Sequence, residues 1–186
     1  MKASGDPWQM IEYEVKMFYA SYKKFFARSA YSRLPYVLKN ALEESAVLHT
    51  RILCDIFLNP RKQKDDIILK DLLLGWPHNA RYRKMKVMHD KLKAEYGEPN
   101  DPTSACWDFN KRLAHATSHR DREYDYREKL DALHPLIRDL IRELESLSGR
   151  HFRLQFDGAT NSPKFFGRNV RGERPERVGG RPSTRI

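Results

Sequence analysis

The fold class of this chain is decided by one stretch of sequence, Leu34-Pro-Tyr-Val-Leu-Lys-Asn-Ala-Leu-Glu-Glu-Ser-Ala-Val-Leu-His-Thr-Arg-Ile-Leu-Cys-Asp-Ile-Phe-Leu-Asn59. Its apolar residues recur at steps of three and four, which places them on one side of an α-helix. The Asn59-Pro60 pair then ends the helix, because a proline disfavours helical backbone in the residue before it. The stripe expected to face the core consists of Leu34, Val37, Leu38, Ala41, Leu42, Ser45, Leu48, Ile52, Ile56 and Phe57.

The same periodicity extends along the chain on both sides of this helix. It predicts further helices over residues 8–29, 66–73, 84–96 and 104–117, and a last one that ends near residue 147. Gly75-Trp-Pro77 indicates a turn anchored by a large aromatic side chain, and Pro135 should kink or split the last helix. The inward side of that helix is expected to carry Leu130, Leu133, Ile137, Leu140, Ile141 and Leu144.

These elements predict an all-α protein, an up-down helical bundle of four to five main helices with a disordered basic C-terminal tail. Residues 1–156 would form the bundle domain. Residues 157–186 are rich in Gly, Pro, Ser, Asn and Arg and poor in apolar residues, a composition typical of disordered segments.

The overall charge restricts the classes of partner. The 186 residues include 35 Lys and Arg against 25 Asp and Glu, a formal net charge of +10, which favours polyanions such as RNA. Cys54 and Cys106 lie in apolar helical contexts, which favours free thiols in a reducing compartment. The sequence shows neither a long uncharged apolar run nor a secretory signal pattern, so we expect a cytoplasmic protein without a membrane partner.

The chemistry of the chain concentrates in Asn110-Lys-Arg-Leu-Ala-His-Ala-Thr-Ser-His-Arg120. A continuous helix would place Arg112, His115 and His119 on one face. Imidazoles transfer protons near neutral pH, and guanidinium groups hold phosphate oxygens. One interpretation is therefore phosphodiester chemistry, with His115 or His119 as general base or acid and with Arg112 or Arg120 stabilising charge on phosphorus.

Two other interpretations of this segment remain open. His115 and His119 have the four-residue spacing of a metal-binding pair, with Asp108 as a third ligand, but Ala116 stands where a catalytic Glu is expected and nearby arginines would repel a cation. We therefore expect no metal and no cofactor. In the other interpretation the cations complement a helix end, and one histidine bonds a carboxylate such as Glu43, Glu44 or Asp55.

A second polar group lies on the long helix quoted first. Glu43, Glu44, His49 and Arg51 could form a supporting shell that faces His115 across the bundle. The alternative is an exposed or salt-bridged helix face, which is the usual meaning of charges on a helix.

The arrangement resembles the HEPN superfamily of small helical bundles. The resemblance rests on the four-helix plan, on Arg112 and His119 with six residues between them, and on the acidic helix segment 42–51 together with Lys111–Thr117 followed by Arg120. It covers roughly residues 8–147. It implies a metal-independent endoribonuclease of a defence or toxin–antitoxin system, often dimeric, with Asn110 orienting the site, or a relative that only binds.

The sequence as a whole thus predicts a protein that engages RNA or another phosphate-bearing ligand. If the protein is an enzyme, His115, His119, Arg112, Arg120 and Asn110 are its candidate catalytic residues. The alternative is a non-catalytic helical interaction module with a basic surface.

Overall fold

The computed structural model describes residues 6–26, 31–59, 63, 66–114 and 126–152. These residues form α-helices and two shorter helical turns, and no strand occurs among them. The elements are α1 (Pro7–Phe26), α3 (Tyr36–Leu58), α4 (Leu69–Leu72), the 3₁₀ turn η1 (Ala80–Tyr82), α5 (Arg83–Tyr96), α6 (Ala105–Asp108), the π-helical turn η2 (Phe109–Ala114) and α7 (Arg127–Ser148). The all-α fold class is therefore confirmed.

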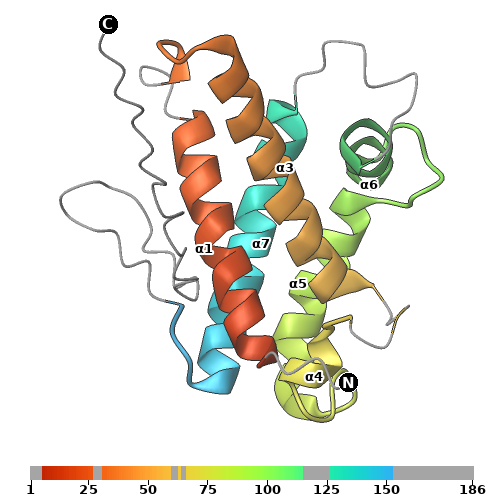
Figure 1. Cartoon of the computed structure of the whole chain (residues 1–186). Helices are drawn as coiled ribbons and strands as arrows, with labels where there is room; N and C mark the ends of the chain where they lie inside the picture. The colour runs from red at the N-terminus through yellow and green to blue at the C-terminus, as the bar shows by residue number, and fades with distance from the viewer. Residues whose placement is uncertain (1–5, 27–30, 60–62, 64–65, 115–125, 153–186) are drawn as a thin grey trace, which may run out of the picture. The chain divides into compact units, whose positions relative to one another are not determined.

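The helices form a bundle around α3. Figure 1 shows α1 and α3 side by side and antiparallel, with α7 and α5 behind them. Helix α3 contacts α1, α5, α7 and η2, and α5 also packs along α7. The chain divides into the units Met1–Leu154 and Gln155–Ile186, and the expected tail in the second unit lies outside the described residues.

The core is built from one side of each long helix. Helix α1 buries Ile11, Val15 and Phe18, which recur at steps of four and three. Each such side chain contributes about 1.5–3 kcal/mol when it is fully buried. Helix α7 buries the six positions expected from its periodicity, Leu130, Leu133, Ile137, Leu140, Ile141 and Leu144.

Helix α3 is rotated relative to the expected stripe. Val37, Leu38 and Leu48 were expected inside but are 73%, 50% and 41% exposed. The buried side instead includes His49 and Thr50, together with Ala46, Val47, Leu53, Cys54, Ile56 and Phe57. The stripe prediction was wrong for Val37, Leu38 and Leu48 and correct for Ile56 and Phe57, because apolar residues surround most of this helix. Polar side chains can be buried when their hydrogen bonds are satisfied, as those of His49 and Thr50 are.

Pro135 does not split α7. The helix runs from Arg127 to Ser148 with the proline inside it. A proline forfeits the hydrogen bond to the carbonyl four residues earlier, here that of Asp131. The apolar side chains of Leu133 and Ile137 are fully buried on either side of it, and their packing outweighs one lost hydrogen bond.

The expected aromatic turn is present between α4 and α5. Gly75 has a φ of 83°, a left-handed conformation that glycine adopts without strain. Trp76 is buried there, with its ring centroid 5.7 Å from those of Tyr82 and His89. The turn therefore closes the end of the bundle where α4 and α5 meet.

An aromatic cluster joins α1 to α7 around His134. The His134 ring stacks on Tyr22, with centroids 3.6 Å apart, and on Phe18 at 5.0 Å. The Tyr22 hydroxyl donates a 2.7 Å hydrogen bond to Asp131. Burial, with a smaller contribution from Arg138 and against the attraction of Asp131, lowers the pKa of His134 to about 4.

This pKa makes the stability of the bundle depend on pH. Between about pH 6.5 and 4 the unfolded chain protonates His134 while the folded chain does not, so the free energy of unfolding falls as the pH falls through this window. Because the ring is partly exposed, we expect a loss of about 1–2 kcal/mol. Urea denaturation of the wild type and of His134→Phe across this range measures the difference, and parallel pH profiles would contradict the assignment.

Candidate functional site

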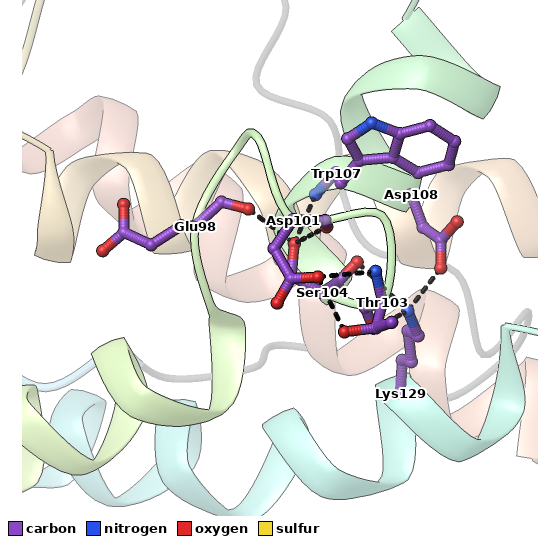
Figure 2. A network of polar contacts seen from close by, with 7 residues as sticks. All are labelled: Glu98, Asp101, Thr103, Ser104, Trp107, Asp108 and Lys129. Atoms are coloured by element: carbon purple, nitrogen blue, oxygen red, sulfur yellow. Dashed lines mark hydrogen bonds and ion pairs between the residues drawn. The ribbon is translucent and has the colours of Figure 1, made fainter.

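The candidate motif begins on a tightly bonded loop. The Ser104 hydroxyl accepts a 3.0 Å hydrogen bond from the Trp107 N–H and so caps α6, and it donates to the Glu98 carbonyl at 2.7 Å. The Asp101 carboxylate accepts from the backbone N–H and the hydroxyl of Thr103, at 2.9 and 2.8 Å (Figure 2). The loop therefore fixes the start of α6 through its own hydrogen bonds.

A buried ion pair then anchors this region to α7. The Lys129 ammonium donates to the carboxylate of Asp108, which is 2% exposed, and to the carbonyls of Thr103 and Ser104 at 2.8 and 3.1 Å (Figure 2). All three ammonium protons thus have acceptors, so the charge is satisfied within the protein. Asp108, which the sequence offered as a third metal ligand, holds Lys129 instead.

The backbone after Asp108 is π-helical rather than α-helical. The sequence predicted an α-helix from about Ser104 to Thr117, but α6 ends at Asp108 and η2 covers Phe109–Ala114. Phe109 is fully buried against Tyr96 and Tyr126, with ring centroids 6.2 and 6.0 Å away. A π-helix bonds residue i to i+5, so the 100° steps that placed the motif on one face do not hold here.

Asn110 is the candidate catalytic residue whose side chain the structure describes. Its amide nitrogen lies 3.5 Å from the sulfur of Cys106, as a weak donor to the thiol. The side chain of Arg112 lies outside the described residues, as do His115, His119 and Arg120. Their proposed roles therefore remain predictions.

The Cys106 thiol beside Asn110 experiences opposing effects on its pKa. Burial raises the pKa of the Cys106 thiol, while the Tyr96 hydroxyl and the Arg51 guanidinium act in the opposite direction. Burial also raises the pKa of Cys54. Both thiols therefore stay neutral, which makes them poor nucleophiles. Arg51 of α3 and Asn110 of η2 share the neighbourhood of one thiol.

His49, another expected supporting residue, has its partner on α1. The His49 Nδ1 lies 2.7 Å from a carboxylate oxygen of Glu14, and the Tyr13 ring meets the imidazole edge-on at 6.0 Å. His49 is thus directed toward α1. Glu43 is half-buried and Glu44 is exposed on the same helix. Arg51 acts through its charge on the Cys106 thiol beside Asn110.

The sequence did not reveal which residues pair with His49 and Asp108. Glu14 is 35 residues from His49, and Lys129 is 21 residues from Asp108. Neither separation produces a recognisable spacing, because such pairs depend on how helices pack. Lys129 could have been noticed only as a cation near the start of an otherwise regular amphipathic helix.

The chain was compared with known protein families, curated proteins and solved structures. No protein-family model, curated protein or solved structure matches the chain. None of the helices in the described part of the chain is long and apolar enough to cross a membrane.

The Asp108–Lys129 pair should have a large effect on stability. Removing one partner leaves the other charge buried without compensation, so Asp108→Asn and Lys129→Met should each cost about 3 kcal/mol of the free energy of unfolding. The double variant Asp108→Asn/Lys129→Met should lose less stability than the sum of the two single losses. Urea denaturation of the four proteins measures this difference as a double-mutant cycle.

The matched control is Lys86→Met. Lys86 pairs with Asp90 at 3.0 Å, but both side chains are more than half exposed, so this change should cost less than about 1 kcal/mol. Equal small effects for Lys86 and Lys129, or strictly additive effects within the cycle, would contradict the anchoring role.

Proposed function

We propose that this protein binds RNA and cleaves it as a metal-independent endoribonuclease, with the segment 110–120 as its active site. The observation that carries the proposal is the π-helical turn η2, whose backbone includes Asn110, Lys111 and Arg112 in succession and which follows directly on the buried Asp108–Lys129 pair. Short π-helical turns occur frequently at functional sites, because they cost stability that ordinary packing gives no reason to lose.

The proposed reaction needs no group that the chain lacks. The 2′-hydroxyl of the RNA attacks the adjacent phosphorus, and one imidazole, of His115 or His119, accepts the hydroxyl proton. The other imidazole donates a proton to the departing 5′-oxygen. The new O2′–P bond and the broken P–O5′ bond leave a 2′,3′-cyclic phosphate and a 5′-hydroxyl. Arg112 and Arg120 would stabilise the negative charge on the phosphorane oxygens.

Helix α5 supports the binding part of the proposal. Between Ala80 and Tyr96 the chain carries six lysines and arginines against two acids. Among these cations, Lys84 is 69% exposed and pairs with Glu143 of α7, and Lys86 is 56% exposed. Such a row of cations attracts phosphates without reading sequence, and its contribution falls steeply with salt.

The biological setting belongs to the same proposal. The resemblance implies a homodimer that acts in the cytoplasm as part of a defence or toxin–antitoxin system. Two buried, free thiols fit a reducing compartment.

A non-catalytic binding module is the second candidate. The observation that favours it is the same basic helix α5, since attraction of a polyanion requires cations and no proton transfer. This candidate predicts binding by every variant described next and cleavage by none.

The test is RNA cleavage in EDTA. We expect the wild type to cleave mixed-sequence RNA and to leave cyclic phosphate ends. Loss of one acid–base group or phosphate contact should slow cleavage at least about 100-fold in His115→Ala, His119→Ala and Arg112→Ala. Lys70→Ala removes an exposed cation on α4 and should leave the rate unchanged.

Two results would overturn the enzymatic proposal. One is the absence of cleavage at high protein concentration while RNA binding persists, which leaves the binding module. The other is equal cleavage by all the folded variants, which indicates a contaminating nuclease. Circular dichroism establishes that each variant is folded.

A further inference from the structure

The outer side of the α1–α3 pair exposes large apolar side chains. On α3, Tyr36, Val37 and Leu38 are 71%, 73% and 50% exposed, and Leu48 is 41% exposed. On α1, Met10 and Tyr13 are 53% and 46% exposed. Tyr36 and Leu38 lie about 100° to either side of Val37 in the first turn of α3, so we give the name outer apolar face to Val37, Leu48, Met10 and Tyr13. Large apolar surfaces that gather in one place usually mark an interaction site.

The two helices contribute to one continuous surface. Val37, Ala41 and Leu48 share one side of α3, and Met10, Tyr13 and Met17 share one side of α1, because steps of three, four and seven return to the same side. The contact of Tyr13 with His49 places the Tyr13 side of α1 against α3, and Leu48 lies about 100° around α3 from His49, on the exposed side. Figure 1 shows α1 and α3 side by side along this layer.

The charges on this surface are balanced, although the chain as a whole carries +10. Lys16 pairs with Glu12 at 2.6 Å on α1, and Arg51 approaches Asp55 at 3.8 Å on α3. A surface of this kind offers no excess of cations to nucleic acid or to an anionic membrane. It suits an apolar partner with balanced charges.

A second copy of the same surface is such a partner. Glu44 is exposed on the outer side of α3, and Arg51, 26% exposed, lies seven residues later at the edge of that side, beyond Leu48. If two α3 helices cross antiparallel at a two-fold axis near Leu48, Glu44 of each copy lies opposite Arg51 of the other copy. The symmetry thus creates two opposite-charge pairs around an apolar centre.

The size of the surface also suits a dimer. Helices of 20 and 23 residues are about 30 and 35 Å long, and packed helices lie about 10 Å apart. The α1–α3 layer therefore presents roughly 600 Å² in projection, and side chains add to this area. A standard interface buries about 800 Å² of accessible surface on each partner.

We propose that the outer apolar face of α1 and α3 is the contact surface between two copies of this chain, which are related by a two-fold axis near Leu48. This inference rests on the proposed function in one respect: it identifies the contact surface of the homodimer that the proposed function includes. The candidate site around Asn110 lies on the side of α3 that faces η2, and Arg51 lies at the edge between that side and the outer apolar face.

The test is the mass of the purified full-length chain in sedimentation equilibrium without RNA. The wild type should have twice the chain mass at micromolar concentration. Leu48→Asp places a charge at the centre of the interface and should weaken dimerisation at least 100-fold. Val87→Asp changes a 54% exposed residue on α5 and should leave the dimer intact.

Exchanging the charges of Glu44 and Arg51 tests the interface in a way that separates lost dimerisation from lost folding. Glu44→Arg and Arg51→Glu should each weaken the dimer about tenfold or more, because each opposes like charges twice. The double variant Glu44→Arg/Arg51→Glu recreates the two pairs and should recover dimerisation. A monomeric wild type at 100 µM, a dimeric Leu48→Asp variant, or a double variant weaker than both single variants would overturn the proposal.

These outcomes are distinct from those of the proposed function. A chain that cleaves RNA and sediments as a monomer overturns the interface and the homodimer, and it leaves the endoribonuclease proposal in place. A dimer with the expected charge-exchange pattern and no affinity for RNA overturns the proposed function alone.

Discussion

The hydrogen bond between His49 and Glu14 is the interaction on which the arrangement of the bundle depends. It is 2.7 Å long and joins α3 to α1 in the interior, where both side chains are largely shielded from water. Helix α3 has apolar residues around most of its circumference, so hydrophobicity alone does not select its inward side. The hydrogen bond from His49 to Glu14 offsets the cost of burying the imidazole. The side of α3 that carries His49 can therefore face inward, which leaves Leu48 outside.

The positions of the proposed site and the proposed interface follow from this rotation of α3. The side near Cys54 contacts η2, and there Arg51 shares the neighbourhood of the Cys106 thiol with Asn110. The outward side carries Val37 and Leu48 beside α1, and this is the surface proposed for a second copy. A rotation of the helix by one residue step would turn both surfaces away from these positions, so the proposed site and the proposed interface depend on the same packing.

The sequence predicted those elements whose apolar residues lie on one side only. Helix α7 is the best example, since Leu133 and Ile137 mark a single stripe between charged residues. Helix α3 could not be oriented this way, because the partner of His49 lies on another helix. The π-helical turn was missed because residues such as Phe109 carry no local preference for it, and the Asp108–Lys129 pair depends on how α7 packs.

The most direct test of this account is a double-mutant cycle on His49 and Glu14, measured by urea denaturation. His49→Leu and Glu14→Leu should each destabilise the fold, because each leaves a buried polar partner without its hydrogen bond. The double variant should recover about 1–2 kcal/mol relative to the sum of the single effects. A coupling energy near zero would show that this pair does not orient α3, and the account of both surfaces would fail with it.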